Sequence, residues 1–93
     1  MFCMVTVEAA ADRSLQRLCQ NVSIAEEIEL RHCANLLTQW LHYDPNLKGI
    51  SSGIHAVYKT LVCGPLFAWF QVLRPIDRRV IIWGFGQNVN WKR

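Results

Sequence analysis

Residues 23–43 are SIAEEIELRHCANLLTQWLHY, and they carry the start and stop signals of a long helix. Ser23 and Glu26 form an S-x-x-E capping box, in which the serine hydroxyl accepts a hydrogen bond from a first-turn amide and the glutamate reaches back to the serine amide. Asp44-Pro45 ends the helix, because the residue before a proline is pushed out of the helical conformation. This stretch is predicted to be the central helix of the fold.

The apolar side chains of this helix cover a wide face. From Leu30 onward they recur at helical spacing. They are Leu30, Cys33, Ala34, Leu37, Trp40 and Leu41, with Leu36 beside them. Ile24 and Ile28 lie off this stripe, so the first turns are expected to contact a different neighbour. A face this wide predicts a helix that is covered on more than one side.

Four further helices are predicted on either side of the central one. Their expected ranges are Thr6 to about Asn21, Ser51 or Ser52 to Cys63, Leu66 to Leu73, and Ile76 to Trp83. Gly64 is expected to end one helix and Pro65 to begin the next, since proline is favoured in a first helical turn. The alternative for Val80–Trp83 is a β-strand, because the run is β-branched and aromatic. Helix is preferred there because the sequence offers few other strands to pair with it.

The expected fold class is therefore all-α, a compact bundle of four or five helices. The 93 residues form one domain, residues 1–93. Its ends are an apolar N-terminal segment, residues 1–5, and an irregular basic and aromatic tail, residues 84–93. Residues 54–73 are long enough to span a membrane, but Lys59 and the central Gly64-Pro65 argue against a span.

Charge divides the chain into two halves. Residues 1–44 carry six acidic and three basic side chains, whereas residues 45–93 carry one acidic and seven basic ones. The net charge is only +3, so its distribution says more than its value. One explanation is that the two halves attract each other weakly within the fold.

The four cysteines are scattered, with no C-x-x-C pair. Buried free thiols in a reducing compartment are the preferred explanation. The first seven residues lack the basic start of a signal peptide, and acidic Glu8 follows directly. An intracellular protein, in the cytoplasm or nucleus, is the expectation.

The segment Asp44–His55 resembles a degenerate EF-hand loop. Asp44 and Asn46 fall at the first and third ligand positions, and Gly49 falls at the sixth, where the loop turns sharply. Lys48 and His55 replace ligands at the fifth and twelfth positions. The resemblance is closer to the non-binding EF-hand-like modules of dystrophin-type proteins, and it implies a helix-loop-helix without calcium.

Other site chemistry is weakly represented. No histidine and cysteine spacing matches a zinc site, no nucleophile lies in a recognisable elbow, and no glycine-rich loop suits a phosphate. The acidic residues cluster at a helix start, where capping explains them. The chain is therefore expected to be non-catalytic, with no metal and no cofactor.

The C-terminal third carries the candidate interaction residues. Trp and Arg are enriched at the energetic centres of protein interfaces. The predicted partner-binding set is Trp69, Phe70, Arg74, Trp83, Phe85 and Trp91. The expected function is that of an interaction or adaptor domain, which binds a partner helix or a second copy of itself.

The alternative function is binding of RNA or single-stranded DNA by the basic half, because cations interleaved with aromatic rings suit such ligands. Its candidate residues are Arg74, Arg78, Arg79, Lys92 and Arg93. The sequence leaves open the identity of the partner, the pathway, the oligomeric state, and whether the chain is a whole protein or an excised domain.

Overall fold

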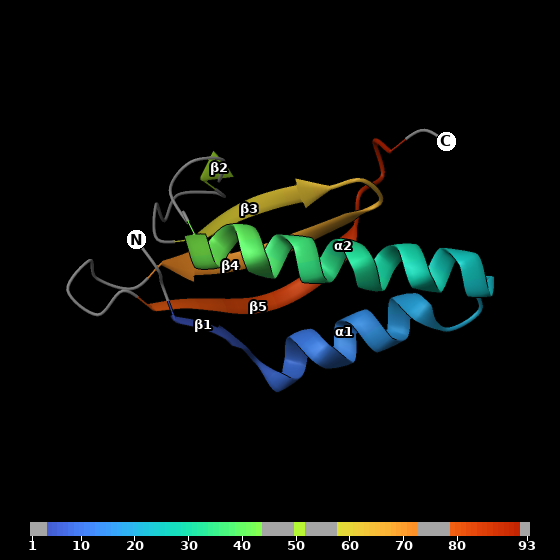
Figure 1. Cartoon of the computed structure of the whole chain (residues 1–93), viewed down its shortest axis with the longest axis horizontal. Coiled ribbons are helices and arrows are strands. Elements are labelled where there is room, and N and C mark those ends of the chain that lie inside the picture. Colours follow the sequence, from blue (N-terminus) through green and yellow to red (C-terminus); the bar gives the residue numbers. More distant parts are fainter. Residues whose placement is uncertain (1–3, 44–49, 52–57, 73–78, 92–93) are drawn as a thin grey trace.

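The structure, a computed structural model, describes residues 4–43, 50–51, 58–72 and 79–91 (Figure 1). Its elements in chain order are β1 (Met4–Val7), α1 (Ala9–Cys19), α2 (Ile24–Tyr43), β2 (Ile50–Ser51), β3 (Tyr58–Cys63), β4 (Leu66–Val72) and β5 (Arg79–Gln87). The strands form one sheet in the order β1-β5-β4-β3-β2, in which β1 runs parallel to β5 and the other pairs are antiparallel. The predicted all-α bundle is therefore wrong: this is a mixed sheet with two helices packed on one of its faces.

The central helix is confirmed as α2. The Glu26 amide donates to Ser23 Oγ at 3.1 Å, and the Ser23 hydroxyl donates to the Glu26 carboxylate at 3.3 Å. One face of α2 packs on the sheet, whereas Ile24 and Ile28 remain 81% and 64% exposed. The helix thus has one covered face among the described residues, rather than several.

The first predicted helix exists but starts later than expected. Its N-cap is Glu8, which makes no side-chain capping hydrogen bond, and Thr6 belongs to β1. Met4–Val7 pairs with Arg79–Ile82 of β5. This pairing between distant parts of the chain removes Thr6 from the helix.

The other predicted helices are wrong where the structure describes them. Residues 58–63 and 66–72 form β3 and β4, so the EF-hand-like outline lacks its second helix. Gly64-Pro65 is the two-residue turn of the β3–β4 hairpin, and Gly64 has the positive φ, 54°, that such turns need. The strand alternative for Val80–Trp83 is confirmed in β5. The EF-hand-like loop positions Asp44, Asn46, Lys48, Gly49 and His55 lie outside the described residues.

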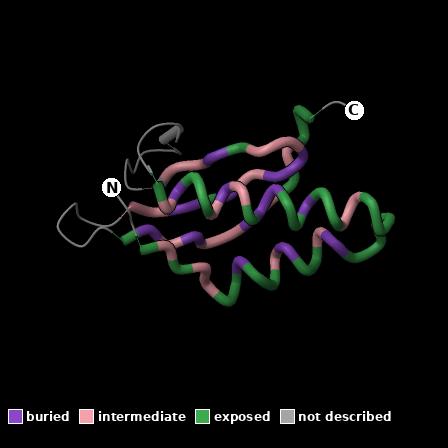
Figure 2. Tube along the Cα trace, in the orientation of Figure 1, coloured by how far each residue is buried: buried purple, intermediate pink, exposed green. Residues whose placement is uncertain are grey.

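One hydrophobic core lies between the helices and the sheet. It contains Ala11, Leu15 and Cys19 of α1, Leu30, Cys33, Ala34, Leu37 and Leu41 of α2, and Leu61, Leu66, Ala68, Phe70, Val80, Ile82 and Phe85 of the strands. Buried and less buried residues alternate along β4 (Figure 2). This period of two is that of a strand with only one face against the core.

Ser14 of α1 ties the helix to β5 beyond the end of β1. The Phe85 amide donates to Ser14 Oγ at 2.9 Å, and the Ser14 hydroxyl donates to the Ala11 carbonyl at 2.6 Å. The last amide hydrogen bond from the β1 side is that of Glu8 to the Ile82 carbonyl, at 3.0 Å. Ser14 therefore satisfies a strand amide that β1 does not reach.

Ser14→Ala is expected to lower the free energy of unfolding by about 1–2 kcal/mol, because it leaves the Phe85 amide without this acceptor in a half-buried site. Urea unfolding followed by circular dichroism measures the change. Gln16→Ala, on the exposed side of α1, is the control and is expected to change stability by less than about 0.5 kcal/mol. Equal effects of the two substitutions would contradict a role for the Ser14 hydroxyl.

Candidate functional site

The face of the sheet opposite the helices carries apolar and aromatic side chains. Cross-strand partners share a face, so the pairing fixes which residues lie there. We define the open face by eight of the described residues of β3, β4 and β5: Thr60 and Val62, Phe67, Trp69 and Gln71, and Arg79, Ile81 and Trp83. Thr6 of β1, the cross-strand partner of Ile81, borders it. Val62 and Trp69 are 47% and 42% exposed. Arg79 is the one charged residue of this set.

A register shift sets Trp83 among these residues. Trp69 pairs with Gly84, but Phe70 pairs with Ile82, so Trp83 is the extra residue of a β-bulge. The Trp83 indole N–H donates to Gln71 Oε1 at 3.1 Å, which places its ring on the same side as Gln71. Because the Trp83 N–H is satisfied within the face, the rest of its ring adds apolar surface.

Two glycines of β5 lie beneath the aromatic rings of β4. Gly86 pairs with Phe67, and a Cβ at Gly86 would lie far inside van der Waals contact with the Phe67 ring. Gly84 pairs with Trp69, and a Cβ there would lie 3.6 Å from Trp69 Cε3. The Phe67 ring therefore covers the backbone of β5 at Gly86, where a side chain would displace it.

Gly86→Ala is expected to displace the Phe67 ring, whereas Gly84→Ala should leave the open face unchanged. The first change demands the volume that the ring occupies, and the second adds an ordinary contact. Heteronuclear NMR spectra of the two variants measure the difference: large shifts for Phe67 and Val62 in Gly86→Ala, and small local ones in Gly84→Ala. Matching spectra would show that Phe67 does not lie over β5.

The residues that the sequence predicts to bind a partner do not all lie on one face of the sheet. Trp69 and Trp83 lie on the open face, whereas Phe70 and Phe85 lie in the core. Trp91 is 45% exposed and lies against the β3–β4 turn, with its ring 3.9 Å from where a Cβ of Gly64 would be. Arg74 lies outside the described residues.

Of the candidate nucleic-acid residues, the structure describes only Arg79, which is exposed on the open face. Arg74, Arg78, Lys92 and Arg93 lie outside the described residues. The sequence interpretation missed Thr60, Val62, Phe67, Gln71 and Ile81. No periodic signal in residues 66–72 could have found them, because residues 66–70 are all apolar.

A hollow of about 270 Å³ continues the open face toward the C-terminal segment. Its described lining residues are Thr60, Val62, Phe67, Gln87, Asn88, Val89 and Asn90. Asn88 holds this segment in place: its side-chain amide donates to the Gly64 carbonyl at 2.9 Å, and its backbone amide donates to the Pro65 carbonyl at 2.8 Å. The hollow is thus a fixed extension of the face.

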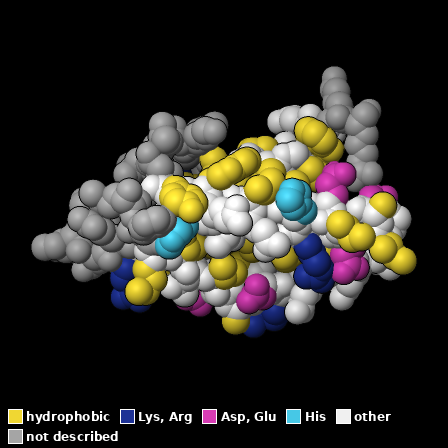
Figure 3. Space-filling view, in the orientation of Figure 1, with side chains coloured by type: hydrophobic (Ala, Val, Ile, Leu, Met, Phe, Trp, Pro, Cys, Tyr) yellow, Lys and Arg dark blue, Asp and Glu magenta, His cyan; other side chains and the backbone are white. Residues whose placement is uncertain are grey.

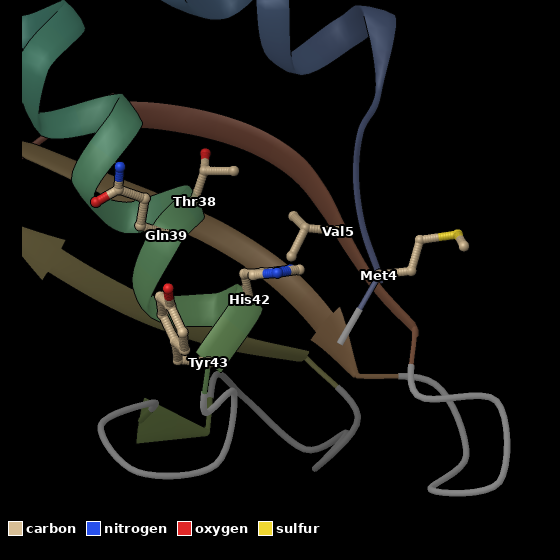
Figure 4. A pocket seen from close by; sticks show the side chains of 6 residues that line it. All are labelled: Met4, Val5, Thr38, Gln39, His42 and Tyr43. Atoms are coloured by element: carbon tan, nitrogen blue, oxygen red, sulfur yellow. The ribbon is translucent and has the colours of Figure 1, made fainter. Parts of the chain in front are cut away.

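A larger hollow of about 510 Å³ lies on the helix side, between the last turns of α2 and β1 (Figure 4). It is lined by Met4, Val5, Thr38, Gln39, His42 and Tyr43. These lining residues include no carboxylate and no thiol. The surface seen from the helix side mixes hydrophobic, acidic and basic side chains (Figure 3). Neither this hollow nor the helix-side surface gathers aromatic side chains as the open face does.

Neither a metal-binding cluster nor a membrane-spanning helix is found in the described ranges. Among them, no three His, Cys, Asp or Glu side chains lie close enough together to hold a metal ion. No helix in the same ranges is long and apolar enough to cross a membrane.

No protein-family model matches the chain, and no curated protein matches its sequence. A solved structure does share the fold. It is the crystal structure of the toxin–antitoxin complex RelBE2 from Mycobacterium tuberculosis, with a chain that superposes with a TM-score of 0.74. The match covers 95% of the present chain and 100% of the other, at 12% sequence identity. At this identity the likeness establishes the helix-and-sheet fold alone.

Proposed function

We propose that this chain is a non-catalytic protein-binding module, and that it joins a second protein through the open face of its sheet. The observation that carries the proposal is the set of neighbouring aromatic and apolar side chains on that face, with Trp69 and Val62 nearly half exposed. A sheet face that stays in water normally carries polar residues in alternation with the apolar ones of the covered face. A partner that covers these rings would remove the apolar surface from water.

An amphipathic acidic helix is the partner segment that best suits this face. The other face of the sheet is already covered by α1 and α2, so a helix on the open face would complete a third layer. Acidic residues at its margins would complement Arg79, the charged residue of the open face as defined above. The solved neighbour is named as a complex of a toxin with an antitoxin, which supports binding of a second protein.

Peptide selection combined with NMR mapping tests this proposal. Random 20-residue peptides displayed on phage are selected on the immobilised chain and counter-selected on its Trp69→Ser variant. Enrichment of acidic amphipathic sequences is expected, and the shifts they induce should centre on Phe67, Trp69, Ile81 and Trp83. Failure to enrich any sequence, or shifts confined to α2, would overturn the proposal. So would light scattering that shows a dimer in which the open face is already covered.

Single-stranded RNA is a second candidate ligand, favoured by the Phe67 and Trp69 rings of β4 and by exposed Arg79 at the start of β5 on the same face. Bases stack on such rings, and cations neutralise phosphates. Fluorescence anisotropy with a labelled oligonucleotide at 50 and 200 mM salt separates this candidate from the first, because phosphate contacts make the affinity fall steeply with salt. Cleavage of the oligonucleotide in the same mixture would contradict the non-catalytic part of the proposal.

A further inference from the structure

Two thiols meet between α2 and the β3–β4 hairpin. Cys33 lies in the middle of α2 on its sheet-facing side and is 6% exposed. Cys63 is the last residue of β3, is half-buried, and packs against the core. Its cross-strand partner Leu66 is fully buried on the helix side, so Cys63 also faces α2. The two cysteines are 30 positions apart in sequence, and the fold brings their side chains together.

The turn beside Cys63 confirms how closely α2 approaches. A Cβ at Gly64 would lie only 3.5 Å from Cys33 Sγ. The Cys63 thiol is also close enough to Cys33 to help raise the Cys33 pKa. Both cysteines are free in the structure. The packing therefore places two reduced thiols close to each other.

The two thiols differ in their access to solvent. Burial raises the pKa of Cys33 to about 12, and the neighbouring Cys63 thiol and the Glu29 carboxylate add to the rise. Cys33 is therefore a neutral thiol at pH 7, and an external reagent reaches the less buried Cys63 first. Solvent access thus puts Cys63 first, and Cys33 follows through the small fraction of its thiolate.

We propose that Cys33 and Cys63 form a reversible disulfide when a low-molecular-weight disulfide such as glutathione disulfide oxidises them. In the first step the Cys63 thiolate attacks the reagent, an S–S bond forms to Cys63, and one glutathione leaves and takes up a proton. In the second step Cys33 loses its proton to solvent and attacks the Cys63 sulfur, which releases the second glutathione. Two protein thiols are oxidised, and one glutathione disulfide is reduced to two thiols.

The bond would fasten α2 to the hairpin and close a loop through residues 34–62. A closed loop restricts the unfolded chain, so the oxidised protein is expected to melt about 10 °C above the reduced one. Because both thiols lie on the helix side, the open face is unchanged, and the bond would stabilise the module without blocking it. Transient disulfides of this kind are compatible with a reducing compartment.

Intact-mass analysis and peptide mapping after incubation in glutathione buffers test the proposal. A variant with Cys3→Ser and Cys19→Ala leaves the pair as its only thiols, and mapping of the unmodified chain gives the same readout should that variant fold poorly. Loss of two hydrogens and a linked peptide containing Cys33 and Cys63 are expected, both reversed by dithiothreitol. Closure of the Cys63–glutathione adduct should be faster at pH 8.5 than at pH 6, because the small thiolate fraction of Cys33 rises with pH.

The matched control is Cys33→Ser in the same background, which should keep the glutathione adduct on Cys63 and show no rise in melting temperature. Three outcomes would overturn the proposal. They are a pair that stays reduced in oxidising buffer, a Cys63 adduct that closes no faster at pH 8.5 than at pH 6 with Cys33 present, and a linkage of either residue to Cys3 or Cys19 in the unmodified chain.

Discussion

Phe70→Ala is expected to lower the free energy of unfolding by about 3–5 kcal/mol, the cost of emptying a large buried aromatic site. Phe70 has no exposed surface and lies in the middle of β4. Its cross-strand neighbours are Lys59 of β3 and Ile82 of β5, so the cavity would open where the sheet meets the helices. Urea unfolding at equilibrium, with unchanged m-values, measures the loss.

Trp69→Ala is the matched control, one residue away on the same strand. Trp69 points to the open face and is 42% exposed, so its removal should cost about 1 kcal/mol. The ratio of the two losses tests the strand directly, because neighbours on a strand point to opposite faces. Equal losses would contradict the division of β4 into a covered face and an open one.

The local signals of α2 made it predictable from the sequence. A capping serine, a glutamate three residues later, a regular apolar stripe and a terminal Asp-Pro all act within a few residues of one another. The structure places the helix at Ile24–Tyr43. Each of these signals is settled by neighbouring residues, so no knowledge of the rest of the chain was needed.

The sheet was missed because strand pairing is not local. Residues 66–70 are all apolar, and a short run without polar residues has no visible period, so helix and strand fit it equally. The Gly64-Pro65 pair was interpreted as a helix boundary, although it also suits a hairpin turn. Helix was then preferred for Val80–Trp83 because no strand had been recognised as its partner. One wrong assignment thus supported the next.

The candidate site was only partly visible in the sequence. The excess of large aromatic residues in the C-terminal third pointed to an exposed surface, and Trp69 and Trp83 do lie on one. Composition could not separate Trp69 from Phe70, since only the strand register sends one to the open face and the other to the core. Nor could it show that the two Gly residues of β5 leave room for the β4 rings.

Trp69→Ser is expected to weaken binding of a selected acidic peptide by about 30-fold or more. Truncation of a central interface tryptophan typically costs 2 kcal/mol or more, which corresponds to that factor. The loss should appear with little change in folding, because Trp69 contributes little to the core. Isothermal titration calorimetry gives the affinity, and thermal unfolding of the same samples shows whether the fold is retained.

Trp91→Ser tests whether the peptide binds a defined interface or any exposed tryptophan ring. Trp91 is 45% exposed, close to the value for Trp69, but it lies against the β3–β4 turn at Gly64. Its removal should leave the peptide affinity within about twofold, since a residue outside the covered face contributes little. If Trp91→Ser weakened the peptide as strongly as Trp69→Ser, the peptide would be responding to exposed tryptophan in general. That result would show that the open face is not the binding surface. Trp69 and Trp91 are similarly exposed, and what distinguishes Trp69 is that it lies among Phe67, Ile81 and Trp83.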